Sequence, residues 1–406
     1  MKKIFTNARL VLPNEQQPQQ CSLIVDGDRF ASADEANGDE LRETIDCKGR
    51  LLAPGIVDLG VFAIDKPAFR FGGVTRAALM PDQAPVLDLP AMIKHNAVEG
   101  KPDLWSHPIA AATKGLEGKQ LAEIGLMQRS GAKAVATGRQ WIADSGIMLR
   151  LLQYCKSLDL PLIVHSEDAG LTGDAVATNG ETATRLGLAS ATAAAESVSI
   201  ARDIALVRET GAHIHFRQVT TADGLSLIRA AKSEQLPVTC GITPAHLLLS
   251  DIAISDFRTF ARLSPPLRSE ENRLACVEAV KDGTIDVISS GHDPRGPEDK
   301  RLPFAEAAPG MAGAETLLAL SFTLVRDEVI SIGRLFELLS TNPAKILGVE
   351  AGLLQAGYEA DFILIDEDAP WQVDTRKMAA AAGNTPFDGL PVQGRVTAIY
   401  KGGRAY

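Results

Sequence analysis

The apolar positions at the two ends of the chain form short runs separated by turn-forming residues. Near the amino terminus such runs cover residues 4–11, 22–25 and 51–52, and the Asp-Gly-Asp of residues 26–28 favours a hairpin turn. Residues 361–365 and 396–401 repeat this pattern before a Gly-Gly pair at 402–403. Because chain ends often lie close together, the pattern predicts one small β-sandwich domain built from residues 1–52 and 349–406.

The middle of the chain alternates short apolar runs with segments of helical periodicity. Strands are predicted at residues 53–59, 160–165, 213–219, 237–242 and 287–290, and helices at 145–158, 191–210 and 222–234. Repeated strand-helix units indicate a parallel sheet, and their size favours a (β/α)8 barrel over residues 53–348. No G-x-G-x-x-G follows the early strands, which weakens a dinucleotide-binding interpretation.

Composition narrows the classes of partner. With 41 Lys and Arg against 51 Asp and Glu, the net charge is −10, which argues against nucleic acid and against an anionic membrane surface. No window approaches the roughly 18 apolar residues of a membrane span. The five cysteines are scattered without a C-x-x-C pair, which suggests neither a structural zinc site nor a disulfide framework. The cysteine usage is typical of a cytoplasmic protein.

Ionisable residues gather where the predicted barrel strands end, which is where barrel enzymes carry their chemistry. Five of the seven histidines fall in these segments: His165, His213, His215, His246 and His292. His165, followed by Glu167 and Asp168, is the best ligand candidate, but zinc requires about four donors. A buried structural role is expected for the same-face pair His213 and His215, and turn packing for His246. We place His95 and His107 on loops or surface helices.

Several spaced motifs resemble the dihydroorotase branch of the amidohydrolase superfamily, almost from end to end. The motifs are A-P-G-I-V-D-L (53–59), L-I-V-H-S-E-D (162–168), I-T-P-A-H-L-L-L (242–249), S-P-P-L-R (264–268), G-M-A-G-A-E-T (310–316), S-T-N-P-A (340–344) and N-T-P-F (384–387). The resemblance implies an amidohydrolase barrel. It also implies reversible hydrolysis of a cyclic amide, in which one or two zinc ions generate hydroxide and an aspartate moves the proton.

Most of the family's metal positions carry side chains that cannot bind zinc. The H-x-H pair corresponds to Gly60 and Phe62, and the bridging carboxylate to Ala136 or Thr137, with Lys133 out of place. A later histidine ligand is Gln218, and the catalytic aspartate is Gly291. Only His165 matches a ligand, while His292 follows Gly291 as in the family.

The positions that hold the substrate in the family are changed as well. The arginine after the H-x-H pair corresponds to Ile64, the asparagine of M-P-N to Asp82, and the asparagine before P-P-L-R to Ser264. A substrate carboxylate would lose its cationic partner and its amide partners together. The resemblance therefore implies that no zinc cofactor is held.

Three hypotheses follow. The sequence resembles inactive dihydroorotase-like chains that accompany bacterial aspartate transcarbamoylase, which implies a scaffold role beside that catalytic chain in a homo- or hetero-oligomer. Alternatively, the chain is an active dihydroorotase with an atypical metal site, or a metal-free hydrolase using His165, Glu167, Asp168 and His292. Thirdly, Arg139, Arg217 and Arg295 near the barrel mouth could bind an anion in a sensor, although we favour the simpler explanation of surface solvation or pairing with Asp293.

Overall fold

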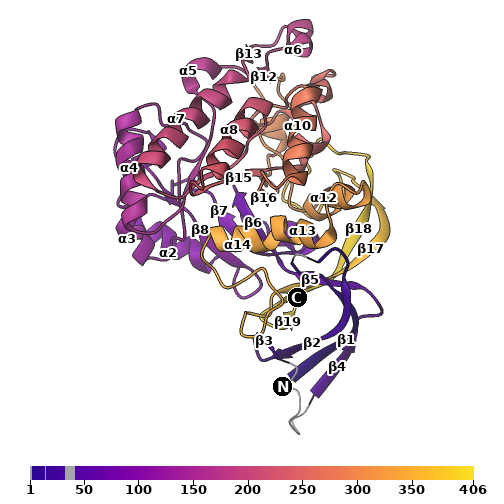
Figure 1. The fold of residues 1–406 in the computed structure, drawn as a ribbon. Coiled ribbons are helices and arrows are strands. Elements are labelled where there is room, and N and C mark those ends of the chain that lie inside the picture. The colour runs from indigo at the N-terminus through magenta and orange to yellow at the C-terminus, as the bar shows by residue number, and fades with distance from the viewer. Residues whose placement is uncertain (1, 14, 33–41) are drawn as a thin grey trace.

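The protein folds into a barrel of parallel strands joined to a separate β-rich unit (Figure 1). The structure is a computed structural model that describes residues 2–13, 15–32 and 42–406. In Figure 1 the indigo amino-terminal strands lie below the barrel, and the yellow carboxy-terminal strands run down its right side toward them, so both ends of the chain build the β-rich unit.

The barrel wall consists of short parallel strands in two sheets that meet at Ile109. The strands are β6 (Ile56–Val61), β7 (Val74–Leu79), β8 (Trp105–Pro108), β9 (Ala110–Ala111), β10 (Val135–Ala136), β11 (Leu162–Val164), β14 (Ile214–Phe216), β15 (Val238–Ile242) and β16 (Val287–Ile288). The backbone N–H of Ile109 donates to Leu79 O and that of Ala110 to Ala134 O, which joins the two sheets. Phe62 N donates to His292 O, which links the segments that follow β6 and β16 and closes the ring.

Helices surround this wall, and the longer ones bury an apolar face. They are α1 (Lys66–Gly72), α2 (Pro90–Val98), α3 (Ile124–Arg129), α4 (Ser145–Ser157), α5 (Ala169–Thr172), α6 (Glu181–Leu186), α7 (Ala194–Thr210), α8 (Ala222–Ser233), α9 (Pro244–Leu248), α10 (Glu270–Lys281), α11 (Pro297–Lys300), α12 (Leu317–Arg326), α13 (Ile332–Phe336) and α14 (Asn342–Ile346). Short helical turns lie at η2 (Lys114–Leu116), η3 (Asp251–Ile254), η4 (Thr259–Ala261) and η5 (Glu337–Thr341). The predicted helices at 145–158, 191–210 and 222–234 correspond to α4, α7 and α8.

The β-rich unit is a sheet that combines strands from both ends of the chain. Its order is β19 (Arg404–Ala405), β18 (Pro391–Lys401), β17 (Phe362–Gln372), β5 (Leu51–Pro54), β1 (Lys2–Leu10), β2 (Gln19–Asp26) and β3 (Arg29–Ala31), with β4 (Arg42–Asp46) paired to β1. A separate pair, β12 (Ala177–Thr178) and β13 (Ser190–Ala191), lies outside it. The strand β5 runs across residue 52, the limit predicted for the terminal domain. The limits predicted for the two domains stay predictions.

Aromatic rings fill the interior of the terminal sheet. The rings of Phe362 and Tyr400 are stacked with centroids 4.5 Å apart, and Phe5 packs edge-on against both. These residues come from β17, β18 and β1, so apolar contact ties the two chain ends together. Such aromatic pairs typically contribute about 0.5–1.5 kcal/mol beyond their buried area.

A buried ionic cluster fixes the terminal sheet to the barrel. Arg76 of β7 donates through Nε to Asp361 Oδ2 at 2.9 Å, and Lys401 Nζ donates to Asp361 Oδ1 at 2.9 Å. Glu359 accepts from Arg76, Lys401 and the indole of Trp105. Removing one partner of such a buried set leaves an uncompensated charge, so the cluster defines how the two units join.

The placement of His107 on a loop or surface helix was wrong. His107 lies in β8, 3.5 Å from Arg76 Nη1, and burial together with the positive charge of Arg76 lowers its pKa to about 3. It is therefore a neutral ring within the ionic cluster. His95 lies on the exposed side of α2, as expected. No helix among the described residues is long and apolar enough to cross a membrane.

Candidate functional site

The carboxyl ends of the barrel strands bring the altered family positions together. Phe62 follows β6, Thr137 follows β10 and its hydroxyl accepts from His165 N at 3.2 Å. A Cβ built on Gly291 would lie 3.1 Å from Thr243 and 3.9 Å from Gln218, and one on Gly60 would lie 3.5 Å from Arg217. The structure thus places these positions around one central space, as their order in the sequence predicts.

Two arginines and a phenylalanine ring occupy this centre. The guanidinium of Arg139 lies 3.6 Å from the centroid of the Phe62 ring, and that of Arg217 lies 5.1 Å from it. Phe62 is only 8% exposed, so these cation–π contacts form largely away from water, where they are strongest. The space that remains among Phe62, Arg139, Arg217 and Met311 is only about 20 Å³, about the size of a single water molecule.

Arg217 is the most deeply buried cation of the centre. Its side chain is 4% exposed, its Nε has no hydrogen-bond partner, and its Nη2 lies 3.3 Å from His165 Nδ1. Burial, followed by the nearby charge of Arg139, lowers the pKa of Arg217 to about 10, so the group stays protonated at neutral pH. Surface solvation, one of the explanations we considered for this arginine, is therefore wrong.

Both nitrogens of His165 are engaged. Since an arginine can only donate, Nδ1 of His165 accepts from Arg217, and Nε2 carries the hydrogen that faces Glu167 Oε2 at 3.4 Å. Arg268 Nη2 donates to the other carboxylate oxygen of Glu167 at 2.8 Å. Burial alone would raise the pKa of Glu167, but the hydrogen bond from His165 and the charge of Arg268 outweigh it and lower that pKa to about 2.

Arg268 belongs to the S-P-P-L-R motif and lies at the middle of a buried polar network. It donates to Thr220 Oγ1 at 2.9 Å and to Thr178 Oγ1 at 3.1 Å, and its Nη2 lies 3.6 Å from Glu196 Oε2. Glu196, from α7, also accepts from the backbone N–H and hydroxyl groups of Thr220 and Thr221. Arg268 therefore ties the segments that follow β11 and β14 to the helix α7.

His292 and Asp168 are not directed into the central space. His292 is fully buried, its Nδ1 accepts from Ala314 N at 3.3 Å, and its Nε2 lies 3.4 Å from Asp65 Oδ2. Asp168 caps α5 and accepts from the backbone of Gly170 and Leu171. Of the residues named for a metal-free hydrolase, His165 contacts Arg217 of the centre and Glu167 contacts His165, but none of the four lines the central space itself.

The altered substrate positions are dispersed around the centre. Asp82 accepts from Arg139 N at 2.9 Å, while its other carboxylate oxygen is buried without a partner. Ser264 lines the central space, and Ile64 lies apart beside Asp65, packed against the apolar core. Pairing with Asp293 is confirmed for Arg139 at 2.7 Å and for Arg295 at 3.1 Å.

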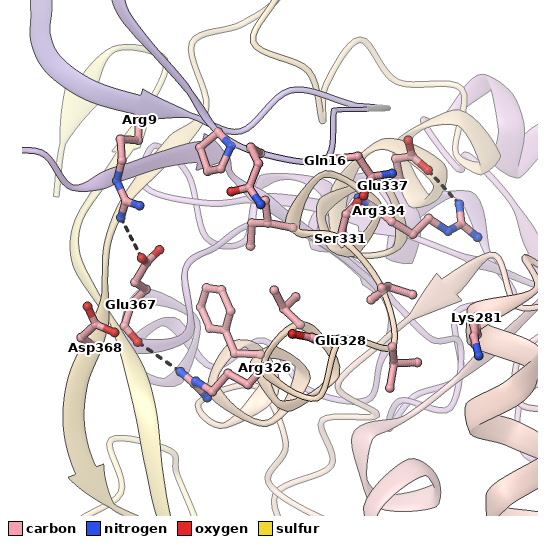
Figure 2. Close-up of a pocket in the computed structure, with 17 residues that line it drawn as sticks. Arg9, Gln16, Lys281, Arg326, Glu328, Ser331, Arg334, Glu337, Glu367 and Asp368 are labelled. Atoms are coloured by element: carbon pink, nitrogen blue, oxygen red, sulfur yellow. Dashed lines mark hydrogen bonds and ion pairs between the residues drawn. The ribbon is translucent and has the colours of Figure 1, made fainter.

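A larger cavity, of about 860 Å³, lies away from these strand ends (Figure 2). Arg334 donates to Ile285 O just before β16, which puts this cavity at the opposite end of the barrel. Figure 2 shows two ion pairs in its lining, Arg9 with Glu367 and Arg334 with Glu337. Sequence reasoning did not identify this cavity, and none of the altered family positions lines it.

Comparison with known proteins supports the architecture. Residues 106–406 match the model of the Amidohydrolase family. The chain is 35% identical to the dihydroorotase of Desulforapulum autotrophicum, over 98% of this chain and 97% of that protein. It is 34% identical to the dihydroorotase of Syntrophus aciditrophicus, over 100% and 99% of the two chains.

Solved structures share the same fold. The L-hydantoinase (dihydropyrimidinase) from Arthrobacter aurescens superposes with a TM-score of 0.88 at 24% identity, covering 99% of this chain and 95% of that one. The dihydropyrimidinase from Brevibacillus agri gives 0.85 at 21% identity, covering 100% and 95%. The predicted barrel with a β-rich terminal unit is confirmed.

Proposed function

The chain belongs to the amidohydrolase family, with dihydroorotases among its relatives, and from this premise we propose that it is a non-catalytic dihydroorotase-like protein of pyrimidine biosynthesis. We further propose that it assists assembly of the aspartate transcarbamoylase catalytic chain. The observation that carries the proposal is the centre itself, where Phe62 and Arg217 occupy the space among the altered metal positions.

The donor set at this centre does not fit zinc. A zinc ion takes about four N, O or S donors, and among the described residues no group of three or more His, Cys, Asp or Glu could hold a metal. The lone pair of His165 Nδ1 already accepts from Arg217. At an effective dielectric constant of about 20, a divalent cation about 5 Å from the buried guanidinium would be repelled by roughly 7 kcal/mol.

The retained motifs support a role that needs the fold rather than the chemistry. Asn384 donates to Asp293 O and Gly310 O and accepts from Arg295 N, which ties the loops at the barrel mouth together. Glu315 accepts from Ala379 N at 2.7 Å. These motif residues act on the chain's own backbone, so the framework stays ordered without a bound substrate.

The association proposal is tested by mixing the full-length chain with the transcarbamoylase catalytic chain from the same organism. We expect multi-angle light scattering to give one complex heavier than either protein, together with a gain in transcarbamoylase activity. The catalytic chain with serum albumin in place of this protein provides the control. Two unshifted peaks with unchanged transcarbamoylase activity would refute the association.

Lack of catalysis needs a separate assay, because the curated relatives bear the name dihydroorotase and favour an active enzyme as the alternative. The purified chain, supplemented with zinc, is assayed for dihydroorotate hydrolysis and for the reverse closure of carbamoyl aspartate. We expect turnover no higher than that of the buffer. Turnover that rises in proportion to bound zinc would establish the alternative.

A further inference from the structure

A second cavity opens beside the filled centre. It measures about 240 Å³ and lies between the segment that follows β10, the short helix α5 and the loop that precedes the S-P-P-L-R motif. Its lining includes the ionisable residues Arg139, His165, Glu167 and Arg262, the indole of Trp141 and the polar residues Gln140, Thr172 and Ser264. Nothing in the family resemblance assigns a role to Arg262 or Trp141.

Arg262 is a cation without a counter-ion. Its Nε is buried and has no hydrogen-bond partner, and among the described residues its guanidinium forms no ion pair. Burial is the only cause that lowers its pKa, so no carboxylate compensates the lost hydration. The residue is only partly buried, but its buried Nε–H has no acceptor in the free chain, and a bound oxygen acceptor would satisfy this donor.

Trp141 adds a second unused donor to the same wall. Its Nε1 is buried without an acceptor, while its ring is held by the guanidinium of Arg202, 4.3 Å from the ring centroid. Arg202 in turn donates to Asp203 Oδ1 at 2.6 Å, so its own charge is paired. The indole is therefore fixed in place with its N–H unsatisfied.

The negative charge on the cavity wall is already used. The carboxylate of Glu167 accepts from Arg268 and faces His165. The charge of Arg139 is only partly neutralised, because its partner Asp293 also pairs with Arg295. Donors therefore outnumber free acceptors. Planar guanidinium groups match the geometry of carboxylate and phosphate oxygens, which favours an anion with such oxygens over chloride.

We propose that this cavity binds a small oxyanion ligand, carrying a carboxylate or a phosphate, through Arg262, Arg139 and the Trp141 N–H. The cavity adjoins the family's substrate positions through Ser264, which lines it, but the family's arginine position, Ile64, is absent from its lining, and Arg262 and Trp141 are not among those positions. The inference holds whether or not the barrel catalyses a reaction, so its outcome is separate from that of the proposed function.

Binding is measured by thermal shift and calorimetry on the full-length chain at constant ionic strength. Succinate and inorganic phosphate serve as probes, and chloride is the control. We expect at least one oxyanion to raise the melting temperature in a saturable manner. Saturation with succinate alone assigns a carboxylate site, with phosphate alone a phosphate site, and with both a general oxyanion site. Saturation with neither probe overturns the proposal.

Variants locate the binding. Arg262→Gln should weaken it at least tenfold without lowering the melting temperature of the ligand-free chain, because the side chain has no internal partner to lose. Trp141→Phe, which keeps the ring for Arg202, should weaken it several-fold. The matched control is Arg258→Gln, four residues earlier in the chain. The guanidinium of Arg258 already donates to Asp256 and to Pro386 O, so its removal should leave the ligand affinity unchanged. Equal affinity in wild type and Arg262→Gln would overturn the assignment.

Discussion

Replacing Arg268 by methionine tests whether the retained P-P-L-R motif serves the fold. The Arg268 side chain is 2% exposed, and its Nη2 lies 2.8 Å from Glu167 Oε1 and 3.6 Å from Glu196 Oε2. Methionine fills much of the volume but leaves two buried carboxylates without their cation. Removing one partner of a buried charged set costs about 3–5 kcal/mol, and this value is expected for the free energy of unfolding.

Urea unfolding at pH 7, followed by tryptophan fluorescence, measures that loss. Arg208→Met, which breaks the exposed pair with Glu234, is the matched control and should leave the unfolding midpoint unchanged. Adding Glu167→Gln to Arg268→Met should recover part of the stability, because one of the two stranded charges is removed. A loss below about 1 kcal/mol for Arg268→Met would refute the account of the network.

The wild type and Arg268→Met also differ in how their stability depends on pH, and the direction of this difference can be predicted. In the wild type the folded pKa of Glu167 is lowered to about 2, so its stabilising contribution is present above the ordinary glutamate pKa and is lost as the pH falls toward 2. Without Arg268 the pKa of Glu167 rises, because burial dominates. The stability gap between wild type and variant should therefore narrow on acidification from pH 7 toward about 4, and a gap that widens would contradict this assignment.

Two further predictions concern the centre and the joint between the two units. Restoring the H-x-H pair in Gly60→His/Phe62→His should leave zinc substoichiometric by mass spectrometry of metals, because Arg217 still occupies the centre; one zinc per chain would argue otherwise. Asp361→Asn should lower the free energy of unfolding by roughly 3 kcal/mol, since Arg76 and Lys401 lose one of the two carboxylates that they share and keep only Glu359, and calorimetry showing an unchanged melting temperature would exclude that role.

The sequence predicts the elements whose apolar pattern is simple. The strand expected at 396–401 is the inner part of β18, and the helix expected at 145–158 is α4. Prediction from the sequence fails where a charged residue lies in the core and is neutralised by a partner far away in the sequence. β7 escapes notice because Arg76 interrupts its apolar run, and only the fold brings Asp361 beside that arginine.

The candidate site is predictable in part for the same reason. The altered ligand positions follow from motif order, and the structure brings Phe62 and Gln218 to one centre. What fills that centre does not follow from order, because the direction of the Arg217 side chain depends on packing against Phe62 and His165. The lack of a partner for Arg262 Nε likewise cannot be predicted from the sequence, because it depends on which distant residues pack beside the guanidinium.

Anomalous X-ray diffraction at the zinc edge tests most directly what occupies the middle of the barrel. Crystals grown with excess zinc should show the guanidinium of Arg217 beside the Phe62 ring and no anomalous peak next to His165. An anomalous peak bonded to His165, with Arg217 displaced, would contradict the account and establish a metal centre in this chain.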